Sequence, residues 1–289
     1  MKDFLKDFKE LIKLRLTFLV AFSASVSFLI GCRQQGGYDW GQWVILTVGG
    51  FLVTSAANGF NEIIEKDLDK LMKRTMGRPI PAGRMTTGQA LVLSLFMGLA
   101  GTLMLVQLNF LTGVLSVFSI FLYAFIYTPM KRKSPIAVFI GAFPGALPPL
   151  IGYFAAFDRP SISWIPIVLF LIQFVWQFPH FWGIAWVLDD DYKKAGFRLL
   201  PTTRRDAVSA WFVFISTLVL IPVSLLPTIM GFGGYYIGGI SLAAGLYFCW
   251  CGFKLTRNLD IPSAQKVMFG SFGYLPLVQL ALLFDFISK

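Results

Sequence analysis

Nine long apolar stretches dominate this sequence and leave few folds open to it. They cover residues 16–32, 41–60, 88–107, 110–129, 135–156, 163–187, 209–230, 234–253 and 267–287. A helix needs about 20 mostly apolar residues to cross the hydrocarbon core of a bilayer. Strands of a membrane barrel would alternate apolar and polar residues, whereas a run such as residues 91–108 is apolar on every side. The sequence therefore predicts an all-α integral membrane protein with nine transmembrane helices in one bundle.

The composition excludes an ordinary water-soluble domain. Charged residues make up 14% of the chain and hydrophobic residues 56%, whereas soluble domains carry about 25% charged residues. Residues 1–15 differ from the rest, because lysines and acids occur there at the spacing of an amphipathic helix. We expect residues 1–15 to form an interfacial amphipathic helix and residues 16–289 to form a single nine-helix transmembrane domain.

Basic residues are distributed unevenly between the two ends of the predicted bundle. The net charge is +10, and the connections at the end that contains the N-terminus hold 22 of the 25 Lys and Arg residues. Only Arg33, Arg159 and Lys289 fall at the opposite end. Because cytoplasmic loops of membrane proteins are enriched in Lys and Arg, we expect the N-terminus in the cytoplasm and the C-terminus outside. We attribute the lysines of residues 1–15 to this topology, and we expect no nucleic-acid partner.

One acidic cluster lies at the end of the second predicted span. At about 100° per residue, Asn61, Glu65 and Asp69 fall on one face of a helix. Mg²⁺ prefers such oxygen ligands and is commonly held by one or two carboxylates together with substrate phosphates. Arg74 and Arg78 follow directly, and their planar guanidinium groups match phosphate oxygens. The cluster therefore indicates a site for a divalent cation and a phosphate.

A second acidic cluster follows the sixth predicted span. Gln173, Gln177 and His180 precede a run of three aspartates that ends at Asp191. His180 and Asp191 are eleven residues apart, about three helical turns, so a continuous helix would keep them on one side. Polar residues inside a span usually face a cavity or a partner helix. We therefore expect this stripe to line a site.

Two other interpretations remain open for the clusters. Each cluster taken alone is also typical of a solvated helix end with ion pairs between successive turns. A polytopic transporter would likewise place polar residues on paired helices, but nothing in a transporter requires two metal-type acidic clusters at one surface. Both clusters lie at the same end of the predicted bundle, interleaved with Arg or Lys. This arrangement favours one binding site shared between them.

The residues around the clusters form extended motifs. The first is Asn61-x3-Glu65-x-Asp67-x-Asp69-x2-Met72-x-Arg74-Thr75-x2-Arg78-Pro79, and three further stretches lie at residues 127–152, 176–182 and 191–201. Together these motifs resemble those of the UbiA-type intramembrane prenyltransferases, in the form found in the protohaem IX farnesyltransferase (haem O synthase) subfamily. Family members often carry Asp where this chain has Glu65, which keeps the carboxylate. The broader family usually has an Asp-rich run where this chain has His180, which favours the haem-modifying branch.

The resemblance implies a farnesyl transfer. A member of this subfamily transfers the farnesyl group of farnesyl diphosphate to a vinyl group of haem b, with addition of water, to give haem o. Ionisation of the diphosphate calls for Mg²⁺ as cofactor and for cations aimed at the leaving group. The implied metal ligands, which are also the implied catalytic residues, are Asn61, Glu65, Asp69 and Asp191. The implied diphosphate-binding residues are Arg74, Arg78, Lys131 and Arg132.

The resemblance says less about the acceptor side of the site. The candidate contacts to haem or to the prenyl chain are Gln177, His180, Trp182 and Tyr192. His180 also counts among the catalytic residues, as an iron ligand or a proton carrier, and a hydrogen bond between helices is the alternative. A quinone precursor or chlorophyllide is the alternative acceptor. The implied location is the inner membrane of a bacterium, and a partnership with haem A synthase or with terminal-oxidase assembly stays open.

Overall fold

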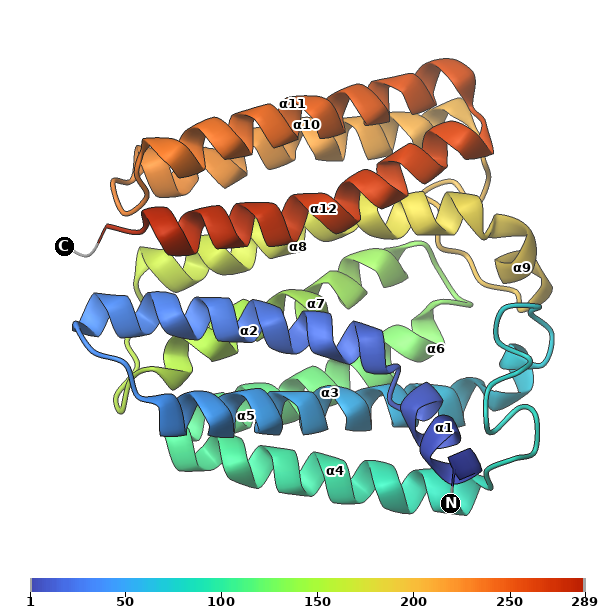
Figure 1. The fold of residues 1–289 in the computed structure, drawn as a ribbon. Helices are drawn as coiled ribbons and strands as arrows, with labels where there is room; N and C mark the ends of the chain where they lie inside the picture. The colour runs from blue at the N-terminus through green and yellow to red at the C-terminus, as the bar shows by residue number, and fades with distance from the viewer. Residues whose placement is uncertain (1, 288–289) are drawn as a thin grey trace.

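The computed structural model describes residues 2–287, and nine helices among them are long and apolar enough to cross a membrane. Each of the nine predicted spans is confirmed (Figure 1). Eight are single helices: α2 (Leu14–Gln35), α3 (Trp40–Asp69), α4 (Thr87–Leu108), α7 (Ile136–Ala155), α8 (Trp164–Val187), α10 (Ala207–Ile229), α11 (Tyr235–Asn258) and α12 (Ile261–Asp285). The remaining one, the fourth span, is composite.

The fourth span contains a stretch of wider helix. It runs from α5 (Phe110–Ile120) through the π-helix η1 (Phe121–Tyr127) to α6 (Thr128–Met130). Long π-helices are rare and frequently occur at functional sites. The stretch brings Thr128 and the residue that follows α6, Lys131, to the end of the bundle where α3 also ends (Figure 1).

The N-terminal segment forms a short helix, α1 (Lys2–Leu11), which ends at Leu11, before the predicted end at residue 15. A turn separates it from α2, and Lys13 adopts a left-handed conformation there, with φ 48 and ψ 55. Leu11 is buried and belongs to a cluster with Ile80, Met85 and Ala90. The helix is therefore anchored to the protein by its apolar face.

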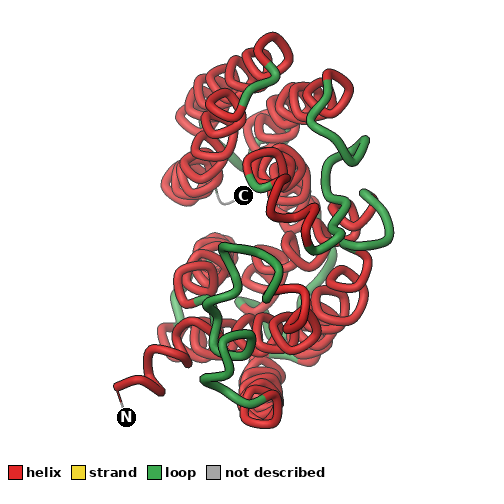
Figure 2. The backbone as a smooth tube through the Cα atoms, turned by 90° about the vertical axis from the view of Figure 1, so that its right-hand side faces the viewer, coloured by secondary structure: helices red, strands yellow, loops and turns green. Residues whose placement is uncertain are grey.

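The spans lie side by side with the two termini at opposite ends (Figure 1). Figure 2 looks onto the end that carries α1 and shows the helices end-on with their loops toward the viewer. The segment between α3 and α4, the end of α6 and the short helix α9 (Asp189–Lys194) all lie at this end (Figure 1). Side-chain caps start several spans, because their oxygens accept bonds from first-turn N–H groups; these caps are Asp39, Thr86, Asp206 and Asp260.

Three prolines inside α7 leave backbone carbonyl groups without a helical partner. Pro149 has no N–H group for the carbonyl of Gly145, and Gln173 of α8 donates a hydrogen bond of 2.7 Å to that oxygen instead. Gln279 of α12 donates to Gln173 at 2.9 Å, and Ser23 of α2 donates to Gln279 at 3.1 Å. This buried chain of hydrogen bonds ties four spans together and gives Gln173 a packing role.

The sixth span does not continue as one helix to Asp191. α8 ends at Val187, Leu188 leaves the helical conformation, and α9 begins at Asp189. Arg205 stabilises this break, since its Nε donates to the carbonyl oxygen of Trp186 at 2.8 Å. The expectation that an unbroken helix keeps His180 and Asp191 on one side is therefore wrong.

Candidate active site

Three oxygen-bearing side chains lie along one face at the end of α3, as the sequence predicts. Asn61, Glu65 and Asp69 are 1%, 3% and 0% exposed. A basic group contacts each of them: Lys13 Nζ lies 2.7 Å from Asn61 Oδ1, Lys131 Nζ 2.9 Å from Glu65 Oε1, and Arg78 Nη1 2.7 Å from Asp69 Oδ2. An unpaired buried charge is very unfavourable. These contacts therefore offset the negative charge of the buried carboxylates when no ligand is bound.

The carboxamide of Asn61 is held in one orientation. Its Nδ2 donates to Glu65 Oε2 at 2.9 Å and to the hydroxyl of Thr128 at 3.1 Å. The Thr128 hydroxyl in turn donates to the carbonyl oxygen of Tyr123 in η1, at 2.8 Å. The oxygen of Asn61 is thereby turned toward Lys13.

The donor set fits a hard divalent cation. Asp69 Oδ1 and Glu62 Oε2 are buried and have no hydrogen-bond partner among the described residues. Buried oxygens of this kind are costly unless a ligand satisfies them. No three His, Cys, Asp or Glu side chains within residues 2–287 converge as a complete metal site. Mg²⁺ at this face would therefore need the amide oxygen and substrate oxygens as further ligands, which is its usual mode of binding.

Positive charge is concentrated around Lys13. Burial first, and then the neighbouring cations Arg78 and Lys131, lower the pKa of Lys13 to about 7. Lys131 Nζ also lies over the rings of Tyr127 and Phe197, 4.8 and 5.5 Å from their centroids. An anion placed among these groups would be strongly stabilised.

Asp191 contacts the segment that follows α3, residues 70–86. Its carboxylate accepts the backbone N–H groups of Lys73 and Arg74, at 3.3 and 3.2 Å, and the ammonium group of Lys194 at 2.9 Å. The hydrogen bond from Lys194 and those from the backbone lower the pKa of Asp191. The structure thus brings the second acidic cluster to the segment that carries Arg74 and Arg78.

Further contacts hold the 70–86 segment in place. Glu62 accepts the backbone N–H of Ile80 at 3.4 Å, and the Thr75 hydroxyl donates to the carbonyl oxygen of Asp69 at 2.9 Å. Arg84 joins the segment to α1, because its guanidinium group donates to Asp7 at 2.8 Å and to Glu10 at 2.9 Å.

Two of the predicted diphosphate-binding residues face solvent. Arg74 and Arg132 are exposed, whereas Arg78 is half-buried and Lys131 is buried. The structure therefore places Arg78 and Lys131, but not the exposed Arg74 and Arg132, against the carboxylates of α3.

The predicted acceptor residues of α8 face two different neighbours. Gln177 Nε2 donates to the carbonyl oxygen of Ala142 in α7 at 2.9 Å. His180 Nδ1 lies 2.9 Å from the hydroxyl of Ser271 in α12, and its ring stacks on Trp176 with centroids 4.3 Å apart. Without any ligand, Gln177 and His180 therefore each have a hydrogen-bond partner on a neighbouring helix.

Trp182 and Tyr192 lie in aromatic surroundings. Trp182 packs against Phe178 and Phe212, and its buried Nε1 has no partner among the described residues. Tyr192 of α9 packs against Phe197 at a centroid distance of 5.7 Å.

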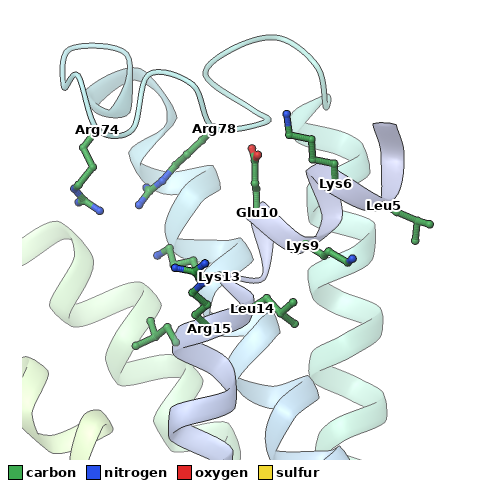
Figure 3. A pocket seen from close by; sticks show the side chains of 10 residues that line it. Leu5, Lys6, Lys9, Glu10, Lys13, Leu14, Arg15, Arg74 and Arg78 are labelled. Carbon is green, nitrogen blue, oxygen red and sulfur yellow. The ribbon is translucent and has the colours of Figure 1, made fainter. Parts of the chain in front are cut away.

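A cavity of about 840 Å³ opens between the N-terminal segment and the 70–86 segment. Six cationic side chains line it: Lys6, Lys9, Lys13, Arg15, Arg74 and Arg78. In Figure 3, Arg74 and Arg78 point from the 70–86 segment toward Lys13 and Arg15. Because Lys13 and Arg78 also contact the α3 face, the cavity adjoins the candidate metal site.

Three residues of the site do not stand out in the sequence. Lys13 resembles the other topology-determining lysines, Thr128 belongs to one of the extended motifs, and Glu62 lies outside the face that carries Asn61, Glu65 and Asp69. The one available signal for Lys13 was its position two residues before Arg15, at the head of the first span.

Comparisons with known proteins agree with this architecture. The model of the UbiA prenyltransferase family matches residues 20–273. A protoheme IX farnesyltransferase of Cytophaga hutchinsonii is 47% identical over 278 residues, which are 96% of each chain. A protoheme IX farnesyltransferase of Christiangramia forsetii is 41% identical, over 97% of this chain and 93% of that protein.

Solved structures share the fold at lower identity. A digeranylgeranylglyceryl phosphate synthase matches with a TM-score of 0.81 and 19% identity over 99% of each chain. A UbiA homolog from Archaeoglobus fulgidus bound to GPP and Mg²⁺ matches with a TM-score of 0.70 and 12% identity, over 96% of this chain and 99% of that one.

Proposed function

The chain belongs to the UbiA prenyltransferase family, and we propose that it transfers the farnesyl group of farnesyl diphosphate to a vinyl group of haem b, with addition of water, to give haem o. It is an integral membrane enzyme of the prenyltransferase class. The observation that carries this function is the near full-length identity of 47% and 41% to two protoheme IX farnesyltransferases.

The α3 face and α9 supply the proposed metal site. Asn61, Glu65 and Asp69 would hold Mg²⁺, with Asp191 added from the second cluster. The unpartnered Oδ1 of Asp69 supports this proposal, as does the Mg²⁺ bound together with GPP in the UbiA homolog of the same fold. Bound Mg²⁺ would offset the negative charge that develops on the diphosphate as the allylic C–O bond breaks.

The basic groups of the site take up the leaving group. Arg78 and Lys131 already lie against the carboxylates of α3, so a diphosphate arriving with its cation would find both within reach. The exposed Arg74 and Arg132 would bind the outer oxygens of the diphosphate from the solvent side. Charge-assisted hydrogen bonds of this kind are roughly twice as strong as neutral ones.

The acceptor side would be formed by Gln177, His180, Trp182 and Tyr192. The bond between His180 Nδ1 and Ser271 fixes the imidazole ring, which leaves Nε2 for the haem iron or for the proton of the added water. The aromatic surroundings of Trp182 would exclude water from the allylic cation until the vinyl carbon attacks.

The orientation in the membrane follows from the charge pattern. We place the protein in the bacterial inner membrane with the N-terminus and the active-site loops in the cytoplasm and the C-terminus outside. Residues 16–289 act as one transmembrane domain with residues 1–15 at the interface. Haem A synthase and terminal-oxidase assembly factors are candidate protein partners.

A product assay tests the function. Purified protein in detergent, given farnesyl diphosphate, Mg²⁺ and haem b, should form haem o by mass spectrometry. The same mixture with a quinone precursor or chlorophyllide in place of haem b should yield no prenylated product. Prenylation of one of these acceptors without haem o would contradict the proposal.

A further inference from the structure

The cavity between the N-terminal segment and the 70–86 segment holds more positive charge than its protein surroundings compensate. Glu10 is the one acidic residue among its lining residues, and Arg84 already binds that carboxylate at 2.9 Å. Lys6, Lys9, Arg15 and Arg74 form no ion pair with any side chain that the structure describes. The cavity therefore offers unpaired cationic groups to an acidic ligand.

The cations stand on two facing walls. Arg74 and Arg78 come from the 70–86 segment, whereas Lys13 and Arg15 come from the start of α2 (Figure 3). The first wall adjoins the acidic face of α3 through the ion pair of Arg78 with Asp69, so it suits the diphosphate. On the second wall Lys13 also contacts the α3 face, at Asn61, but a diphosphate held at the first wall would leave Arg15 without an acidic partner.

The second wall also carries apolar groups. Leu14 and Leu16 line the cavity beside Arg15, together with Leu5 of α1. An acidic ligand with a large apolar body suits such a surface. Haem b has two propionate carboxylates on an apolar ring, and a guanidinium group can bind a carboxylate through two parallel hydrogen bonds.

We propose that the second wall, formed by Lys13 and Arg15, binds the propionate carboxylates of the haem acceptor, with Arg15 as the main contact. This assignment rests on the proposed function. It orients the haem so that its propionates lie at the loop end of the bundle and its vinyl edge points toward the spans. The headgroup of an anionic phospholipid offers a similar negative charge, so the test must separate the two sources.

Esterified haem isolates the contribution of the carboxylates. Binding of haem b and of its dimethyl ester is measured by absorbance titration in a non-ionic detergent without added lipid. The wild type should bind haem b about tenfold or more tightly than the ester, as expected for charged hydrogen bonds. Arg15→Gln should remove this preference and leave ester binding and the KM for farnesyl diphosphate unchanged. Arg257→Gln, at an exposed arginine of α11, is the matched control and should keep the preference.

Three results would overturn the assignment. The wild type could bind the ester as tightly as haem b, or Arg15→Gln could raise the KM for farnesyl diphosphate without changing haem affinity. Vesicles of phosphatidylglycerol, but not of phosphatidylcholine, could abolish the preference, which would assign the wall to lipid headgroups. If haem o still forms in the product assay, these results remove the inference alone. A wild type that keeps the preference but forms no haem o removes the proposed activity instead.

Discussion

The ammonium group of Lys13 lies 2.7 Å from the amide oxygen of Asn61, although the two residues are 48 positions apart in the chain. This contact joins the start of the first span to the acidic face of α3. The N-terminal segment is therefore part of the candidate active site.

The contact predicts the effect of removing the Lys13 amino group. Lys13→Met should lower turnover by about tenfold, because it removes the hydrogen bond to the proposed metal ligand Asn61, and such a bond contributes about 1.5 kcal/mol. Haem o formation by mass spectrometry measures the change. Lys70→Met alters an exposed lysine whose one ion pair within residues 2–287 is with Asp67, and it should retain full activity. Wild-type turnover in Lys13→Met would show that the contact has no catalytic consequence.

The ligand assignment predicts a contrast between two faces of α3. Glu65→Gln or Asp69→Asn should nearly abolish turnover, because each variant removes a buried carboxylate from the proposed Mg²⁺ site. Asp67→Asn changes an exposed carboxylate of the same helix and should leave turnover close to wild type. Size-exclusion profiles must show that all three variants are folded. Full activity in Glu65→Gln would disprove its assignment as a ligand.

The hydrogen bond of Gln173 to the Gly145 carbonyl predicts a stability effect. Gln173→Leu should leave that carbonyl and Gln279 without their partner, at a cost of about 1–3 kcal/mol per unpaired buried group. A thermal unfolding assay in detergent measures the loss as a lower midpoint. Gln107→Leu, at an exposed glutamine of α4, should leave the midpoint unchanged. Equal midpoints for the two variants would contradict the packing role of Gln173.

The imidazole of His180 predicts a spectroscopic change. If Nε2 binds the haem iron, His180→Ala should shift the absorbance of bound haem, because the axial ligand sets the electronic state of the iron. Ser271→Ala removes only the partner of Nδ1 and should keep the spectrum close to wild type. An unchanged spectrum in His180→Ala would rule out iron ligation and leave the bond between α8 and α12 as its role.

Much of the fold was predictable from the sequence, because each span must bury about 20 apolar residues in lipid. Periodicity alone also places Asn61, Glu65 and Asp69 on one face, and α3 does continue as a helix through Asp69. These features depend on local sequence, and they were predicted correctly.

Features that depend on contacts between distant segments were not predictable in this way. The bond of Gln173 exists because Pro149 on another helix lacks an N–H group, which the glutamine stripe itself does not reveal. At the break around Leu188, Arg205 binds the carbonyl oxygens at the end of α8. The partner of Lys13 lies in another helix. In each case the deciding group lies far away in the sequence.

The most direct test of the account is the metal dependence of haem o formation. Purified protein with haem b, farnesyl diphosphate and Mg²⁺ should yield haem o, excess EDTA should stop the reaction, and added Mg²⁺ should restore it. Product formation that continues in excess EDTA would contradict a divalent cation held by Asn61, Glu65 and Asp69 as the centre of the reaction.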